Sequence, residues 1–296
     1  MTTPPLDVIT DLRVKWNAFS ADYTEVFNKS ISIQSARELH RHLDLDTATS
    51  VLEVGAGAGL GSLDALRYLE SSGLGTKYIL SDLSPSMLDL AKQNILASKC
   101  TIPIDVVEAN GMYVHLVHMS STVVDDSAIP DLAQDLKLPD ASVDRYISTL
   151  VLQLVPDPDA MLRESHRVLG SGGVAGFVIW GQVEHTAFFR LLAAANDKLG
   201  VPSGFTSNYA LGRDLPTLRT KLRTAGFSSA SVWPYLAVAE KWEAEKYATL
   251  AGRLFPVDDE AFHLRRHAVL VELAAAWLAT GQPIGMETYL VVAKKE

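Results

Sequence analysis

Residues 51–59 read Val-Leu-Glu-Val-Gly-Ala-Gly-Ala-Gly, and this stretch decides the fold. An apolar run that contains one acidic residue, Glu53, passes into three glycines separated by single alanines. A pattern typical of a helix follows from Leu60 to Tyr68. Glycine has no Cβ, so the backbone can turn sharply and approach a ligand closely. The stretch predicts a strand, a tight turn that holds a ligand, and a helix; the alternative is an ordinary strand-to-helix turn.

A second apolar segment, residues 78–81, ends in Asp82. Ser84 is a candidate N-cap, and Pro85 suits the first turn of the helix that follows. In an open α/β sheet, an acidic residue at the end of the second strand can accept hydrogen bonds from ribose hydroxyls. The alternative is that Asp82 only caps the next helix. Its distance from the glycines favours the ribose role.

Three further segments follow in order along the chain. Residues 136–148 read LKLPDASVDRYIS, residues 152–157 read LQLVPD, and residues 162–173 read LRESHRVLGSGG. Together with the glycine motif and the Asp82 motif, they resemble class I S-adenosylmethionine (SAM)-dependent methyltransferases, and in pattern the small-molecule enzymes of the ubiquinone/menaquinone-biosynthesis type. The resemblance covers residues 51–180. It implies an α/β, Rossmann-like fold with a mainly parallel seven-stranded sheet, helices on both faces and an added helical cap.

The resemblance also implies a cofactor, SAM, and a product, S-adenosylhomocysteine. The glycines would admit the methionine part, Glu53 would orient that part, Asp82 would bind the ribose, and Leu83 would line the adenine. Asn110 stands where relatives usually have the Asp that contacts adenine. The predicted cofactor residues are Glu53, Gly55, Ala56, Gly57, Asp82, Leu83, Met87, Asn110, Gly111, Thr149 and Leu150.

The residues that would contact the methyl acceptor are marked less clearly. Tyr23, Gln153 and Trp180 are the candidate acceptor-binding residues, with simple packing on the sheet as the alternative for the aromatic ones. Gln153 stands where relatives often have His, so a general base is absent there. His185 is the candidate base because an imidazole titrates near neutral pH. The alternative is that His185 is only a polar residue in the first turn of the next helix.

The chain is predicted to be one methyltransferase domain, residues 1–296. Strand-like and helix-like segments alternate, which argues for a mainly parallel sheet covered by helices. We expect a helical lid at 1–45 and a helical cap at 237–283. Residues 112–133 look like an insertion, because their removal joins the flanking residues into a family-like run. Since loop length affects stability only weakly, the insertion is predicted to be dispensable for folding and to perturb the adenine pocket.

Composition limits the partners and the location. The chain has 26 Lys and Arg and 35 Asp and Glu, a net charge of −9, whereas nucleic-acid binders usually carry a basic surface. Cys100 is the single cysteine, the N-terminus has no signal-peptide pattern, and no apolar run is long enough to span a membrane. His115 and His118 lack a third ligand nearby, so no metal site is expected. These features predict a cytoplasmic protein, monomer or homodimer, that binds no nucleic acid.

The expected function is transfer of a methyl group from SAM to an O, S or N atom of a small molecule by direct in-line displacement. Two alternatives remain. One is an NAD-dependent dehydrogenase, although the glycine spacing differs from the G-x-G-x-x-G fingerprint. The other is a catalytically weak or inactive methyltransferase-like partner subunit, disabled by the insertion at 112–133.

Overall fold

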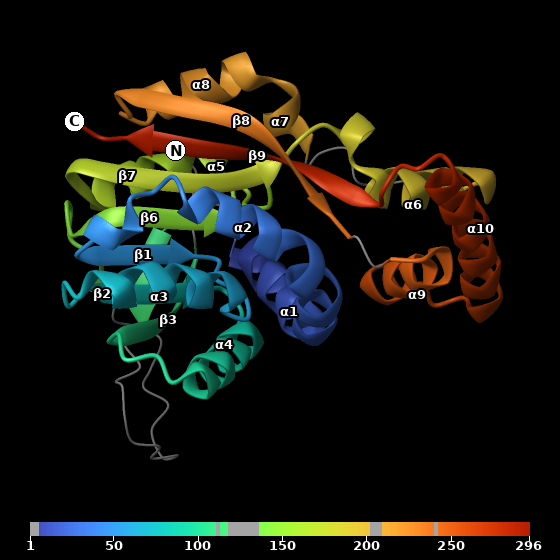
Figure 1. The fold of residues 1–296 in the computed structure, drawn as a ribbon, viewed down its shortest axis with the longest axis horizontal. Coiled ribbons are helices and arrows are strands. Elements are labelled where there is room, and N and C mark those ends of the chain that lie inside the picture. Colours follow the sequence, from blue (N-terminus) through green and yellow to red (C-terminus); the bar gives the residue numbers. More distant parts are fainter. Residues whose placement is uncertain (1–5, 111–112, 118–135, 202–208, 240–241) are drawn as a thin grey trace.

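One sheet forms the centre of the protein (Figure 1). The computed structural model describes residues 6–110, 113–117, 136–201, 209–239 and 242–296. Within these ranges the sheet contains the strands β1 (Ser50–Val54), β2 (Lys77–Asp82), β3 (Ile104–Asn110), β4 (Tyr113–Val117), β5 (Leu136–Lys137), β6 (Val143–Thr149), β7 (Leu169–Trp180), β8 (Ser229–Val238) and β9 (Gly285–Lys294). Their order across the sheet is β5-β4-β3-β2-β1-β6-β7-β9-β8.

Seven of these strands, from β3 to β8 in that order, form the predicted mainly parallel sheet. β1, β2, β3, β6 and β7 pair in parallel, and β9 is antiparallel to both β7 and β8. Residues 51–54 of β1 are all buried, as expected for a central strand that is covered on both faces. The Rossmann-like fold predicted from the sequence is confirmed.

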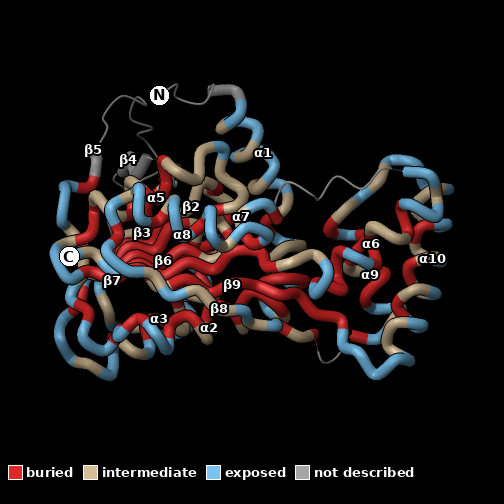
Figure 2. Tube along the Cα trace, turned by 90° about the horizontal axis from the view of Figure 1, so that it is seen from above, coloured by how far each residue is buried: buried red, intermediate tan, exposed pale blue. Residues whose placement is uncertain are grey.

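Helices cover both faces of the sheet. The helices are α1 (Leu6–Tyr23), α2 (Ile33–His40), α3 (Leu60–Ser72), α4 (Pro85–Ser98), α5 (Pro158–Val168), α6 (Ala187–Lys198), α7 (Ala210–Arg213), α8 (Leu215–Thr224), α9 (Ala244–Leu254) and α10 (Glu260–Ala279), with the π-helix η1 (Thr24–Ser32) and the 3-10 turns η2 (Leu45–Thr47) and η3 (Val183–His185). Figure 2 shows α2 and α3 on one face, α5, α7 and α8 on the other, and α6, α9 and α10 gathered beyond one end of the sheet.

The helix that follows the Asp82 strand begins as predicted. Ser84 Oγ accepts a 3.2 Å hydrogen bond from the backbone N–H of Met87, and Pro85 occupies the first helical turn. This cap satisfies one of the backbone donors that a helix start leaves free, and proline needs no such donor there.

Part of the predicted insertion belongs to the sheet. Tyr113–Val117 form β4, which lies antiparallel to β3 with Asn110 opposite Tyr113 and Glu108 opposite Val117, around an irregularity in the register. Residues 113–117 of the predicted insertion are therefore part of the sheet. Residue 112 and residues 118–133 lie outside the described ranges.

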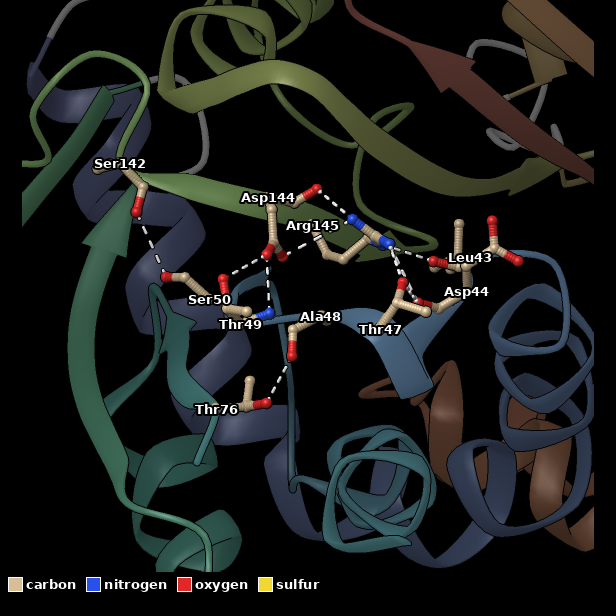
Figure 3. A network of polar contacts seen from close by, with 10 residues as sticks. All are labelled: Leu43, Asp44, Thr47, Ala48, Thr49, Ser50, Thr76, Ser142, Asp144 and Arg145. Atoms are coloured by element: carbon tan, nitrogen blue, oxygen red, sulfur yellow. Dashed lines mark hydrogen bonds and ion pairs between the residues drawn. The ribbon is translucent and has the colours of Figure 1, made fainter. Parts of the chain in front are cut away.

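A buried arginine in β6 stabilises the loop at the amino-terminal ends of the central strands (Figure 3). Arg145 of β6 donates to the carbonyl oxygens of Leu43 (2.6 Å) and Asp44 (3.1 Å) and to Thr47 Oγ1 (2.8 Å). The preceding Asp144 accepts hydrogen bonds of 2.7 Å from the N–H and hydroxyl of Thr49. Multiple charge-assisted hydrogen bonds make a buried guanidinium tolerable, and they fix the turn that leads into β1.

The predicted helical cap lies at the far end of the sheet. Within it, α9 and α10 pack against each other, and α10 packs against α6. Arg253 of α9 forms an ion pair with Asp22 of α1, which connects this group of helices to the N-terminal segment. Among the helices of the described residues, none is long and apolar enough to cross a membrane.

Candidate functional site

The glycine turn after β1 requires glycine for two different reasons. Gly55 has φ +72°, and a Cβ placed on it would lie 2.2 Å from Cγ2 of Val151, so no other residue fits. Gly57 has φ +55°, but a Cβ there would meet nothing closer than Asn28 Nδ2 at 3.6 Å and Met87 Sδ at 3.9 Å. The bare backbone of Gly57 therefore borders open space, where a larger side chain would take the room of a ligand.

Asp82 lies at the carboxyl end of β2 and is oriented by backbone donors. Its Oδ2 accepts a 2.8 Å hydrogen bond from Gly57 N–H, and its Oδ1 accepts a 2.9 Å hydrogen bond from Ser84 N–H. Burial raises the pKa of Asp82 to about 6, although these two backbone donors act in the opposite direction. A group that hydrogen-bonds to the ionised carboxylate, such as a hydroxyl pair, would lower that pKa again.

Two adjoining cavities lie at the carboxyl ends of β1, β2, β3 and β6, where open α/β sheets bind ligands. The larger one holds about 740 Å³ with its open mouth included, and it is lined by the predicted residues Gly55, Gly57, Asp82, Leu83, Met87, Asn110, Thr149 and Leu150. The smaller one is lined by the predicted residues Glu53, Gly55, Ala56, Gly57 and Thr149. Tyr23 lines both. The structure thus brings together every predicted cofactor residue except Gly111, which lies outside the described ranges.

Glu53 forms the floor of the smaller cavity. Its Oε2 accepts hydrogen bonds from Ser62 Oγ and, at 2.7 Å, from Tyr78 Oη. Burial raises the pKa of Glu53, while these two donors and the nearby His40 lower it. A cationic group at this end of the cavity would favour the ionised carboxylate further.

His40 is close enough to Glu53 to lower the pKa of that carboxyl, and its own side chain is almost fully buried. Its Nδ1 lies 2.9 Å from Asp64 Oδ2, which makes the pair a part of the packing between α2 and α3. The His40 ring is a polar group near Glu53, and the sequence motifs did not predict it.

The N-terminal segment covers the larger cavity. Ile9, Leu12 and Trp16 of α1 line it, and Asn28 and Ser32 of η1 line the smaller cavity. Sequence reasoning placed this segment in a helical lid at 1–45 but named none of these residues. Single-turn π-helical segments occur frequently at functional sites, and η1 contributes two polar side chains to the lining that Glu53 and Gly57 share.

Side-chain hydrogen bonds hold α1 against β3 and against the start of α4, next to the cavity. Arg13 donates to both carboxylate oxygens of Glu108 in β3, at 2.6 and 3.2 Å. Asn17 Oδ1 accepts hydrogen bonds from Ser84 Oγ (2.6 Å) and from Ser86 N–H (3.3 Å). Asn17 therefore links the covering helix to the loop that carries Asp82.

Three of the four acceptor-side predictions are not placed at the cavities. Trp180 is buried and stacks on Phe189 with ring centroids 4.6 Å apart. Gln153 lines neither cavity. His185 has a side chain that is 60% exposed, and its Nδ1 lies 2.7 Å from Glu287 Oε2. Of the four candidates, only Tyr23 lines the two cavities, and an acceptor-binding role for Trp180, Gln153 and His185 stays a prediction.

The described part of the chain shows no group of three or more His, Cys, Asp or Glu side chains that could hold a metal ion. The side chains of His115 and His118 are not among those described. The titratable groups that do line the cavities are Glu53, Asp82 and Tyr23. Burial raises the pKa of Tyr23 to about 12, so its hydroxyl stays protonated at neutral pH.

Comparison with known proteins agrees with this geometry. Residues 52–177 match the family model described as "Methyltransferase domain". A protein of Oryza sativa subsp. japonica, 2-methyl-6-phytyl-1,4-hydroquinone methyltransferase 1, chloroplastic, is 27% identical over 138 residues, which are 47% of this chain and 31% of that protein. The match thus spans less than a third of the rice protein's length.

Two solved structures share the fold at low sequence identity. Phosphoethanolamine N-methyltransferase 2 of Haemonchus contortus, in complex with phosphomonomethylethanolamine and S-adenosylhomocysteine, has a TM-score of 0.56 and 15% identity, covering 97% of this chain and 59% of that one. The [4+2]-cyclase SpnF has a TM-score of 0.54 and 13% identity, covering 97% and 96%. Residues 52–177 of this chain therefore match a methyltransferase domain, and the two solved structures show that the fold is shared.

Proposed function

We propose that this protein binds SAM across the two cavities and transfers its methyl group to a nucleophilic atom of a small molecule. The adenosine part would lie in the larger cavity with its ribose on Asp82, and the methionine part would lie in the smaller cavity near Glu53. The supporting observation is that predicted residues from four strand ends line two cavities that adjoin at Tyr23, Gly55, Gly57 and Thr149.

The junction of the cavities suits the reactive end of SAM. Thr149 and Tyr23 border both cavities, so the methyl–sulfur bond would lie between them. Oγ1 of Thr149 is buried and has no hydrogen-bond partner among the described residues. Buried hydroxyls are normally paired, and a ligand at the junction would supply the partner. When bound, SAM supplies an electrophilic methyl group, so the protein needs only to hold the acceptor in line.

The fold alone does not establish the reaction, because the [4+2]-cyclase SpnF shares it. The test is therefore transfer of isotopically labelled methyl from SAM to a panel of small thiols, phenols, amines and carboxylates. We expect label in an extractable product and S-adenosylhomocysteine formed in equal amount. Consumption of SAM without a labelled product, or no consumption with any acceptor, would count against the proposal.

A matched pair of variants makes the assay specific to the cavity. Asp82→Ala removes the carboxylate that faces the larger cavity, whereas Asp89→Ala removes one on the next helix whose side chain is 70% exposed. We expect the first variant to lose transfer at limiting SAM and the second to keep it. Equal activity of the two variants would show that the label is transferred elsewhere or by a contaminant.

A further inference from the structure

We propose that a hollow between α8 and the start of β8 is a second binding site, which takes a phosphate monoester with a small apolar group. The site is separate from the proposed methyl-transfer site and does not depend on that function. The position of the hollow, two arginines that no described carboxylate neutralises, and the apolar residues beside them support this assignment.

The hollow lies away from the strand ends that carry the two cavities. It holds about 910 Å³ with its open mouth included, and it is lined by residues of α8 and by residues 228–230. α8 lies beside β8, the last strand in the order of the sheet (Figure 1). Ser229 of β8 lies opposite Lys294 of β9, which lies opposite Val174, six residues before the end of β7 at Trp180. No described residue lines both the hollow and a cavity.

Two arginines of α8 give the hollow a positive charge. Arg219 and Arg223 line it, and no Asp or Glu is among the described residues that do so. Arg219 Nη1 donates a 2.9 Å hydrogen bond to the carbonyl oxygen of Ala230. Arg223 Nη2 donates a 3.3 Å hydrogen bond to Thr220 Oγ1. Neither guanidinium forms an ion pair with a carboxylate in the described part of the chain, so both charges remain available to an anion.

The spacing of the two arginines favours an anion beside them. They stand four residues apart, so they lie on one face of α8, where like charges repel. Lys221, the cation between them in the sequence, pairs instead with Asp159 at 2.8 Å. The helix dipole favours Arg223 in the last turn of α8, but it does not explain Arg219. A phosphate bound by both guanidinium groups would remove the repulsion and accept several charge-assisted hydrogen bonds.

The other residues of the hollow define the rest of the ligand. Leu215, Pro216 and Ala230 are apolar, so they can contact an organic group attached to the phosphate. Ser228 and Ser229 carry hydroxyls that can bond to phosphate oxygens. A phosphate monoester carries close to two negative charges at neutral pH, which matches the two arginines, whereas a carboxylate carries one.

The test is calorimetric titration of phenyl phosphate, inorganic phosphate, benzoate and phenol into the full-length protein. We expect phenyl phosphate to bind most tightly, inorganic phosphate and benzoate more weakly, and phenol not measurably. Arg219→Gln and Arg223→Gln change exposed side chains, so both variants should stay folded. Each should weaken phenyl phosphate binding by about tenfold, as for a lost hydrogen bond to a charged group. Arg219→Lys should fall between wild type and Arg219→Gln, because lysine keeps the charge but not the planar fork.

Arg265→Gln is the matched control. Arg265 is an exposed arginine of α10 that does not line the hollow, so its removal changes the net charge equally and should leave phenyl phosphate affinity unchanged. An equal loss in this control would overturn the proposal, because it would assign the effect to overall charge.

The proposal would also be overturned by unchanged phenyl phosphate affinity in both α8 variants, or by no saturable binding to the wild-type protein. Benzoate that binds as tightly as phenyl phosphate would overturn the phosphate assignment. SAM titrated in parallel separates this site from the proposed function. Binding of phenyl phosphate without SAM binding contradicts only the proposed function, and SAM binding without phenyl phosphate binding overturns only the second site.

Discussion

The backbone N–H of Gly57 donates a 2.8 Å hydrogen bond to Oδ2 of Asp82, which joins the turn after β1 to the end of β2. Ser84 N–H holds the other carboxylate oxygen at 2.9 Å. A carboxylate can accept about four hydrogen bonds, so Asp82 keeps acceptor capacity for a ribose hydroxyl. The carboxylate is therefore oriented before the cofactor arrives, which reduces the entropy lost on binding.

The first prediction concerns the pH dependence of SAM affinity. In the proposed complex, ribose hydroxyls would donate to the ionised form of Asp82, and burial raises the pKa of this group to about 6. The affinity should therefore rise as pH rises through 6 and fall below it. If only the ionised form binds, the dissociation constant increases by about tenfold from pH 7 to pH 5, as measured by calorimetric titration.

Asp82→Asn is the control for this prediction. The amide has nearly the same shape but does not titrate, so its weaker SAM binding should lose most of the change near pH 6. A pH profile that is the same in the variant would assign the titration to another group, with Glu53 the first candidate because burial also raises its pKa.

The second prediction compares two glycines of similar backbone conformation. Gly57 has φ +55° at the cavity, and Gly75 has φ +68° with nothing within 4 Å of a Cβ. Valine at either position carries the strain of a left-handed backbone, about 1–3 kcal/mol. Only Gly57→Val should abolish SAM binding, while both variants should lower the melting temperature by similar amounts. Normal SAM affinity in Gly57→Val would reduce the glycine run to a structural turn.

The third prediction concerns the helix that covers the cavity. Asn17→Ala removes the acceptor of two hydrogen bonds from the Ser84 and Ser86 positions. The SAM dissociation constant should rise by about threefold to tenfold, corresponding to about 0.5–1.5 kcal/mol for a lost hydrogen bond. Asn17→Asp keeps an acceptor oxygen and should stay near the wild-type value. Unchanged affinity in Asn17→Ala would show that α1 is held by packing alone, and equal loss in both variants would show that the acceptor oxygen is not what matters.

The fourth prediction concerns residues 112–133. β3 pairs with β2 through five consecutive residue pairs, whereas β4 meets β3 at two registered pairs separated by an irregularity. A chain without 112–133 should therefore fold, melt no lower than the full chain and bind SAM at least as tightly. A clear loss of SAM affinity would show instead that β4 holds Asn110 in the adenine pocket.

The residues that line the cavities at the strand ends could be predicted because the information that places them is local in the sequence. Glu53, the glycines and Asp82 each stand at the end of an apolar strand, and the carboxyl ends of parallel strands meet at one edge of the sheet. Motifs that mark the ends of parallel strands therefore predict which residues lie close together in space. For the same reason, the strands and helices of the central sheet follow from their periodicity.

The acceptor side depends on tertiary packing and could not be predicted in the same way. Trp180 ends β7 as expected, but the register that places it opposite Thr288 also turns its ring onto Phe189. The face of α1 that meets the cavity is set by its contacts with β3 and α4, which the sequence does not display. A π-helix at 24–32 has no sequence signature comparable to a cap or a glycine turn.

Calorimetric titration of SAM into the wild-type protein, Asp82→Ala and Asp89→Ala tests the central claim most directly. The account predicts that wild type and Asp89→Ala bind SAM equally well. Asp82→Ala should remain folded and lose about 1.5–3 kcal/mol of binding free energy, as for hydrogen bonds to a charged group. Its melting temperature without ligand should fall, because the N–H groups of Gly57 and Ser84 lose their acceptor. Unchanged affinity in Asp82→Ala, or no binding to the wild-type protein, would contradict it.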